Sequence, residues 1–475
     1  MREHLRRLGA ETAVYGLSAL AIRFSGLVLV PVYARIFTRS EYGAVSLVNA
    51  TVMVATIFVI LGLDTAAGRW FWDSEEAADR KRTLASWAWC QMFASLLVAA
   101  LLWLLSPQLA QILAPGETTA FRLAVLTLPF SVFGVVLTNR FRLERRAWAA
   151  ASFAFGMAVV NIGATLAFVI GLDWGVKGVF AGQVCSSAVG TVVALVILRD
   201  WVSPRRASAA RLRAMFKYAA PLIPAALAAW AIGFSDRYFV EYYASADAVG
   251  IYQMANSVAS LVALVTLAFQ QAWGPFALSI HSEEGAGEVY SGALLAYAAV
   301  TSTAAAGLSM LAPEVIRVAA TSKFEAASVA VPWLAFGLVA VGLGYVAGLG
   351  PLLARRSRPV AAAIICAGLL NVILNFALIP ALGITGAAIA TLAAQAAIPA
   401  YLFVRSQALH RIPYRFGPAV ALLAAGLVVG VAGERWHPAS VATGVVAKCA
   451  ATLAFAAVAV AVALRHGRVR ETLEP

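Results

Sequence analysis

The sequence predicts an all-α integral membrane protein of about fourteen transmembrane helices, built as two six-helix lobes followed by two further helices. Three observations predict it. Of the 475 residues, 62% are hydrophobic and only 12% are charged, whereas soluble domains have about 25% charged residues. Apolar stretches of about 20 residues, the length that crosses a bilayer, follow one another along the chain. The pattern of the first six stretches recurs in the next six.

The order and charge of the connections predict the topology. The predicted spans are 12–37, 44–63, 84–105, 119–138, 150–171, 177–198, 217–236, 248–271, 289–311, 328–350, 359–380, 385–404, 417–434 and 441–464. Arginine and lysine cluster in alternate connections, and the intervening ones hold only scattered cations. Because basic loops stay in the cytoplasm, we expect both termini to be cytoplasmic in a bacterial inner membrane. One connection on the cytoplasmic side, 273–288, has no lysine or arginine.

An internal repeat relates the two lobes. The matching marks are Gly43 and Gly250 after the first and seventh spans, Arg145-Arg146 and Arg355-Arg356 before two equivalent spans, Asn161 and Asn371 within them, and the turns Gly175-Val-Lys-Gly178 and Gly383-Ile-Thr-Gly386. Both copies start on the same side, so the repeat is parallel, with its axis along the membrane normal. The predicted domains are an N-lobe at 1–198, a basic amphipathic linker at 199–216, a C-lobe at 217–404 and an addition at 405–475. In the addition, Lys448 is expected to snorkel from a helix end.

The first span breaks a rule of membrane helices. Arg23 lies near the middle of the apolar run Thr12 to Phe37, where an arginine costs about 2.5–3.5 kcal/mol on insertion scales. Small residues, Gly16 and Gly26 among them, share its helical face. Two interpretations are open: Arg23 lines an internal cavity and meets an anion, or it pairs with a neighbouring helix.

The sequence lacks the residues that several classes of function require. The formal charge of +13 lies in short clusters between apolar segments, which membrane topology requires, so nucleic acid is not a predicted partner. The four cysteines have no metal-ligand spacing, and the five histidines form no zinc motif. The sequence also has no Walker loop and no nucleophile with a base. We therefore predict no enzyme activity, no cofactor and no metal.

The motifs resemble those of a known family. The run through Pro31, Tyr33-Ala-Arg35 and Glu41-Tyr-Gly43, the pair Asp236-Arg237 and the run Val249-Gly-Ile-Tyr252 are similar to the polysaccharide-biosynthesis flippases of the Wzx type. These belong to the multidrug/oligosaccharidyl-lipid/polysaccharide exporter superfamily. The resemblance covers nearly the whole chain. It implies a V-shaped pair of lobes around a central cavity, and a polyprenyl-diphosphate-linked oligosaccharide as cargo.

A flippase for such a cargo needs fixed cations for the diphosphate and polar or aromatic groups for the sugars. The candidate substrate-binding residues are Arg23, Asn49, Trp230, Arg237, Gln253 and Asn256. The repeat aligns Trp230 with Arg23, so one lobe supplies a cation and the other an aromatic ring. Weaker candidates for gating or structure are Arg35, Asp236, Asn161, Asn371 and Asn375. The three asparagines alternatively join helices by hydrogen bonds.

The sequence thus predicts a flippase that moves this cargo from the cytoplasmic to the periplasmic leaflet by alternating access, for cell-surface polysaccharide such as O-antigen or exopolysaccharide. The expected partners are the cargo, membrane lipids, polysaccharide polymerase or glycosyltransferase machinery, and a coupling ion, H⁺ or Na⁺. The alternatives are a cation-coupled multidrug exporter and a lipid II flippase of the same superfamily. A membrane-embedded glycosyltransferase would need a long outer loop, and the outer connections are short.

Overall fold

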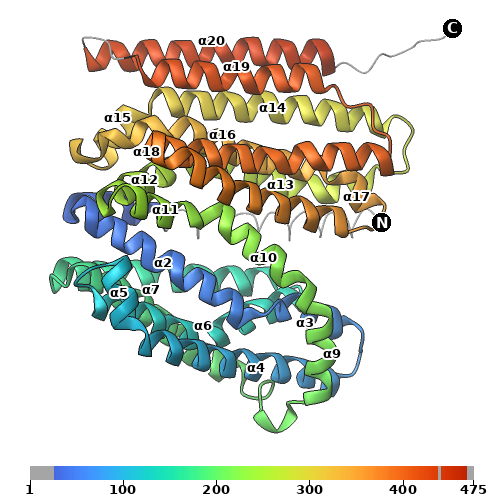
Figure 1. Ribbon diagram of the computed structural model, residues 1–475. Helices are drawn as coiled ribbons and strands as arrows, with labels where there is room; N and C mark the ends of the chain where they lie inside the picture. Colours follow the sequence, from blue (N-terminus) through green and yellow to red (C-terminus); the bar gives the residue numbers. More distant parts are fainter. Residues whose placement is uncertain (1–25, 437–439, 468–475) are drawn as a thin grey trace. The chain divides into compact units, whose positions relative to one another are not determined.

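The computed structural model describes residues 26–436 and 440–467 (Figure 1). Every regular element in these residues is helical. Eleven of the described helices are long and apolar enough to cross a membrane, or twelve if the pair α12 and α13, bent by 46°, counts as one span. The all-α membrane fold is confirmed. The number of fourteen spans stays a prediction, because the first predicted span is described only from its helix Gly26–Ile36 onward.

The chain divides into two compact units, Met1–Trp230 and Ala231–Pro475. In unit 1 the elements are α2 (Arg39–Ile60), α3 (Leu63–Trp72), α4 (Ala77–Leu104), α5 (Ser106–Leu113), α6 (Thr118–Leu143), α7 (Ala147–Leu166), η1 (Ala167–Gly171), α8 (Gly175–Leu198), η2 (Pro204–Arg206), α9 (Ala209–Ala219), η3 (Ala220–Leu222) and α10 (Ile223–Trp230). The predicted linker 199–216 lies within unit 1, where Trp89 of α4 donates to the carbonyl of Val202 at 2.7 Å. The predicted domain boundaries stay a prediction.

In unit 2 the elements are η4 (Ala231–Ser235), α11 (Asp236–Tyr243), α12 (Ala246–Ala259), α13 (Val262–Ser279), α14 (Ala286–Met310), α15 (Ala312–Ala319), η5 (Ser322–Ala330), α16 (Val331–Ala347), α17 (Leu349–Leu353), α18 (Arg358–Leu409), α19 (Phe416–Glu434) and α20 (Val441–Gly467). Helices α19 and α20 both pack against α14, and the three run side by side in Figure 1. The two added C-terminal helices therefore extend unit 2.

Helix α18 is two helices joined by a sharp turn. At 1.5 Å per residue, its 52 residues would extend about 78 Å, far more than the roughly 30 Å of a bilayer core. Gly383 interrupts it with φ 54° and ψ −133°, a backbone conformation that suits glycine. A Cβ at Gly386 would lie 2.4 Å from the carbonyl oxygen of Leu378. The chain therefore folds back on itself at Gly383, as two predicted spans require.

The same local devices recur in both units. Thr38 caps α2 and Ser245 caps α12, each accepting a backbone N–H three residues later. The left-handed turns at Gly175 (φ 57°) and Gly383 (φ 54°) also match. The second glycine of each turn, Gly178 or Gly386, packs on the backbone of the preceding helix. These features agree with the internal repeat.

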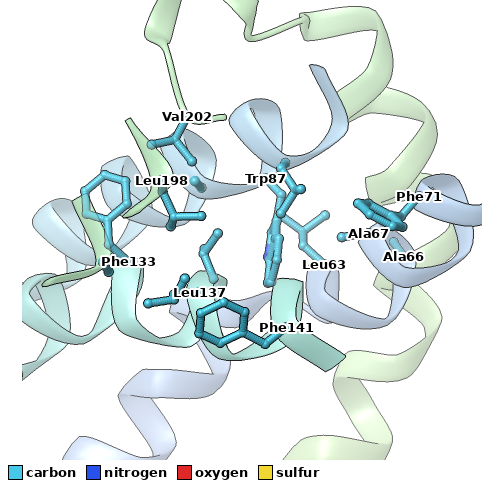
Figure 2. Close-up of a cluster of buried hydrophobic side chains, with 14 of the residues drawn as sticks. Leu63, Ala66, Ala67, Phe71, Trp87, Phe133, Leu137, Phe141, Leu198 and Val202 are labelled. Carbon is cyan, nitrogen blue, oxygen red and sulfur yellow. The ribbon is translucent and has the colours of Figure 1, made fainter. Parts of the chain in front are cut away.

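The core of unit 1 is a cluster of buried aromatic and aliphatic side chains from α3, α4, α6 and α8 (Figure 2). Trp87 of α4 is fully buried there, with Phe71, Phe141 and Leu198 around it in the same cluster. These side chains pack helix against helix and hold the spans of unit 1 together. Unit 2 has its own core, centred on Trp273 and Tyr290.

Candidate functional site

The main cluster of buried polar side chains in unit 2 begins where η4 meets α11. The five residues of η4 form a π-helical turn, a rare element that redirects side chains and recurs at functional sites. Asp236 and Arg237 follow at once, and both are buried. Their span is otherwise apolar enough to cross a membrane. A charged residue at such a position is costly unless it is paired, and it indicates function.

Asp236 is the centre of the cluster. Its side chain is 1% exposed, and its Oδ1 accepts from Nη1 of Arg237 at 3.0 Å. The hydroxyl of Tyr252, on α12, donates to Oδ2 at 2.5 Å. The hydroxyl of Thr391, on α18, donates to the same oxygen at 3.3 Å. Three helices thus converge on one carboxylate, which is the pairing that a buried charge requires.

Arg237 is also fixed by several hydrogen bonds. Nη1 donates to the carbonyl of Gly233 at 2.7 Å, and Nε and Nη2 donate to Oε1 of Gln253 at 3.3 and 3.1 Å. The guanidinium carbon lies 4.8 Å from the ring centre of Phe234. The structure therefore brings together three predicted residues, Asp236, Arg237 and Gln253. In this state, the guanidinium donates to groups of unit 2.

A second polar group lies beside the first. Ser235 donates to Oδ1 of Asn371 at 3.3 Å, and Nδ2 of Asn375 donates to the same oxygen at 3.1 Å. Both asparagines are fully buried on α18. Among the described residues, Nδ2 of Asn371 and Oδ1 of Asn375 have no hydrogen-bond partner. A buried amide in that condition costs about 1–3 kcal/mol, so this corner of the cluster has unused polar capacity.

The comparisons with known proteins identify the family. Residues 8–281 match the family model described as "Polysaccharide biosynthesis protein", which is more than half of the chain. The chain belongs to the polysaccharide biosynthesis protein family. No curated protein sequence matches it.

Solved structures share the fold of this polysaccharide biosynthesis protein. One, described as "Lipid II flippase MurJ, inward closed conformation", matches with a TM-score of 0.77 at 13% identity, over 95% of this chain and 99% of that one. Two describe a multidrug resistance MATE family transporter of the MOP superfamily. The outward-facing form matches with a TM-score of 0.59 at 16% identity, over 87% of this chain and 96% of that one. The inward-facing form has a TM-score of 0.58 at 17% identity, over 86% and 95%. The family match confirms the predicted relation to polysaccharide-biosynthesis proteins, and these structures show that the fold is shared.

The remaining candidates of this polysaccharide biosynthesis protein lie outside the described residues, belong to unit 1 or make a local bond in unit 2. Arg23 lies outside the described residues. In unit 1, Trp230 donates from Nε1 to the carbonyl of Ala50 at 3.0 Å, which ties α10 to α2. Asn49 donates to the carbonyl of Val45 at 2.9 Å. In unit 2, Asn256 donates to the carbonyl of Tyr252 at 3.2 Å.

The last two candidates, both in unit 1, are not fully buried. The exposed Arg35 donates to the carbonyl of Pro31 at 3.4 Å, and Asn161 is half-buried in α7. Although the repeat pairs Asn161 with Asn371, only Asn371 has full burial and a polar neighbour on another helix. The symmetry of the sequence therefore does not extend to the polar groups.

The sequence did not predict two members of the cluster, Thr391 and Tyr252, and the expectation for Lys448 was wrong. Nothing near Thr391 signals its contact with Asp236, and Tyr252 was named only as part of a motif. Lys448 was expected to snorkel. That expectation is wrong, because its side chain is fully buried and Nζ lies 2.7 Å from Oε1 of Glu314 on α15. Among the described residues, no group of His, Cys, Asp and Glu could hold a metal ion.

Proposed function

We propose that the chain is a flippase that carries a polyprenyl-diphosphate-linked oligosaccharide from the cytoplasmic to the periplasmic leaflet of a bacterial inner membrane. The observation that carries this proposal is the family match over residues 8–281 on a chain of membrane-spanning helices. A flippase breaks no bond. It needs membrane-embedded polar groups that stabilise the headgroup, within a bundle whose outer surface stays in lipid.

The cargo's diphosphate calls for arginine, whose planar fork can bind phosphate oxygens bidentately. The proposed partners are Arg23 and Arg237. Asn49, Gln253 and Asn256 would serve the sugar hydroxyls, and the ring of Trp230 would serve a sugar face. Arg237 now donates to Asp236, Gln253 and the carbonyl of Gly233. It can therefore meet a diphosphate only when these contacts open.

Opening of the Asp236–Arg237 ion pair would couple transport to the binding of an ion. A proton or a Na⁺ ion that neutralises Asp236 would remove the main charge partner of Arg237, and the guanidinium would then attract the anionic cargo. Release of the ion would restore the pair and expel the diphosphate. The amide oxygen of Asn375 and the hydroxyl of Thr391 lie within the same polar region. Alternating access would expose this region to each side of the membrane in turn.

The test is leaflet exchange in proteoliposomes that contain the purified full-length chain. The probe is a fluorescent polyprenyl-diphosphate oligosaccharide, and a membrane-impermeant quencher reports the fraction in the outer leaflet. We expect protein-dependent exchange that Arg23→Ala abolishes and Arg23→Lys partly restores. Arg205→Gln, an exposed arginine on η2, controls for the loss of one charge. No exchange of this probe, together with exchange of lipid II or efflux of a cationic drug, would replace the proposal with one of those two activities.

Coupling is tested in the same vesicles with a pH gradient and, separately, a Na⁺ gradient. The gradient that drives accumulation in the far leaflet identifies the ion. Asp236→Asn should flip the probe to equal distribution and lose the response to either gradient, provided that thermal unfolding shows a folded variant. Retention of the gradient response by Asp236→Asn would exclude Asp236 as the coupling group.

A further inference from the structure

A largely apolar groove of about 530 Å³ lies within unit 2, between α16, α17 and the two segments of α18. Val341, Ile364 and Ile398 contribute aliphatic surface to it. Gly344 lies on the same surface, where a Cβ would meet only the side chain of Ile398 at 3.7 Å. The volume is within the range of ligand sites, about 300–1,000 Å³. The groove is therefore wide enough for part of a lipid chain.

The groove reaches the membrane boundary at two arginines. One membrane span ends at Leu353 and the next begins at Arg358, so Arg355 and Arg356 lie in the short connection at headgroup level. Both are exposed and line the groove. Arg355 has a left-handed backbone (φ 53°), and the N–H of Arg356 bonds to the carbonyl of Pro351 at 2.9 Å. This turn fixes the two arginines beside the opening.

Neither arginine forms an ion pair with an acid in the described part of the chain. The preceding residue is Ala354, and no acid follows in the connection. Membrane topology alone would account for two basic residues here. It would not account for an apolar groove that opens directly beneath them.

The repeat supplies an internal comparison. Unit 1 has the same turn, with Arg145 at φ 55° and the N–H of Arg146 bonded to the carbonyl of Phe141 at 2.8 Å. There, however, Arg146 lies 3.6 Å from Glu144 and the guanidinium of Arg145 lies 5.8 Å from the ring of Trp72. The protein thus supplies partners for the unit 1 pair, whereas Ala354 takes the place of Glu144 in unit 2.

The grooves of the two units also differ in the polarity of their lining. The groove at the matching place in unit 1, between α6, α7 and α8, is about 380 Å³. Its lining includes the polar side chains of Ser131, Thr138, Asn139 and Ser187. The unit 1 groove is also lined by one arginine, Arg142, whereas the unit 2 groove combines a more apolar wall with two arginines, Arg355 and Arg356, at its mouth. These two properties match the two parts of an anionic lipid, and they diverged from a shared scaffold.

We propose that the unit 2 groove binds an anionic glycerophospholipid of the membrane, with an acyl chain along α16 and α18 and the phosphate at Arg355 and Arg356. Basic pockets between transmembrane helices bind such headgroups, and each cation near the surface contributes about 1 kcal/mol. The groove has few hydroxyls or amides for an oligosaccharide. Its occupant is thus a resident lipid, separate from the transported cargo.

The experiment measures lipid binding to the purified full-length chain in detergent by native mass spectrometry, with phosphatidylglycerol and phosphatidylcholine of identical acyl chains. We expect preferential retention of phosphatidylglycerol by the wild type. Arg355→Gln/Arg356→Gln should lower the phosphatidylglycerol affinity roughly thirty-fold, which is about 2 kcal/mol at 1.4 kcal/mol per tenfold. Arg205→Gln/Arg206→Gln, the same charge change on exposed η2, should keep the preference.

A second variant tests the apolar part. Gly344→Leu keeps both arginines and fills the groove, so it should reduce retention of both lipids while the unfolding temperature in lipid-free detergent stays close to that of the wild type. The proposal is overturned if the wild type has no preference for phosphatidylglycerol, if the control pair loses the preference equally, or if Gly344→Leu folds and binds both lipids normally. Competition by inorganic pyrophosphate at equal concentration would also overturn it, because the site would then recognise a free anion.

Discussion

Asp236 and Arg237 are neighbours in the chain and form a 3.0 Å ion pair in which both side chains are more than nine-tenths buried. Adjacent residues of a helix point about 100° apart, so their side chains do not normally face one another. Here the guanidinium of Arg237 also reaches back to the carbonyl of Gly233 in the π-helical turn. The π-helical turn and the ion pair are therefore linked, and together they place opposite charges side by side inside a membrane span.

Replacing one residue of the Asp236–Arg237 pair should destabilise the fold more than replacing both. Asp236→Asn or Arg237→Gln alone leaves one buried charge without its partner, and we expect a loss of about 3–5 kcal/mol in the free energy of unfolding. The double substitution leaves no charge and should cost less than either single substitution. Thermal unfolding of all four proteins in one detergent measures the coupling. Additive losses would show that the two side chains act independently of each other.

Packing at the repeated turn gives a second prediction. A Cβ at Gly182 of α8 would lie 2.7 Å from the backbone nitrogen and Cα of Thr165 in α7, whereas one at Gly163 would meet nothing within 4 Å. Gly182→Ala should therefore force the helices apart and cost about 1–3 kcal/mol. Gly163→Ala, the matched control, should be neutral or stabilise by up to about 1 kcal/mol. Equal losses of unfolding temperature would contradict the close approach of α7 and α8.

The structural features that the sequence predicted correctly are local. A glycine in a short connection between apolar runs indicates a turn, and Gly175 and Gly383 adopt the left-handed backbone that this requires. The spans follow from composition alone, because a bilayer sets their length. The cap at Thr38 was not predicted, although it is also local and involves Glu41, three residues away.

The polar contacts that the sequence did not predict join distant segments. Thr391 meets Asp236 across 155 residues, and Lys448 meets Glu314 across 134. No local pattern identifies such partners. Asp236-Arg237 was accordingly interpreted as a helix-end charge pair, a gating ion pair or a contact for the cargo, although its partners lie on α12 and α18. For Arg23, the candidate with the strongest sequence argument, the cavity-lining role stays a prediction.

The second buried pair should respond unequally to its two single substitutions. The side chain of Lys448 has no exposed surface, whereas that of Glu314 is 18% exposed. Glu314→Gln leaves an ammonium group on a side chain with no exposed surface, and Lys448→Met leaves a carboxylate on a side chain that is 18% exposed. We expect Glu314→Gln to lower the unfolding temperature more, and Glu314→Gln/Lys448→Met to recover most of the loss. The reverse order would indicate that Lys448 reaches solvent after all.

A carboxyl at the end of a span should make stability depend on pH. Burial raises the pKa of Glu117, just before α6; nearby Glu41 raises it further, and Lys177 opposes both. A raised pKa means that the folded state holds this proton more tightly than the unfolded chain does, so the charged form weakens the fold at neutral pH. The penalty fades as pH falls through the folded pKa towards the ordinary value of 4.5.

Glu117→Gln removes the charge at every pH. We therefore expect the variant to unfold at a higher temperature than the wild type at pH 8, with the difference shrinking steadily towards pH 4. Thermal unfolding across this range measures it, and Glu75→Gln, at an exposed acid before α4, controls for the loss of one negative charge. A difference between Glu117→Gln and the wild type that stays constant with pH would mean that the Glu117 carboxyl is as well solvated in the folded protein as in the unfolded chain.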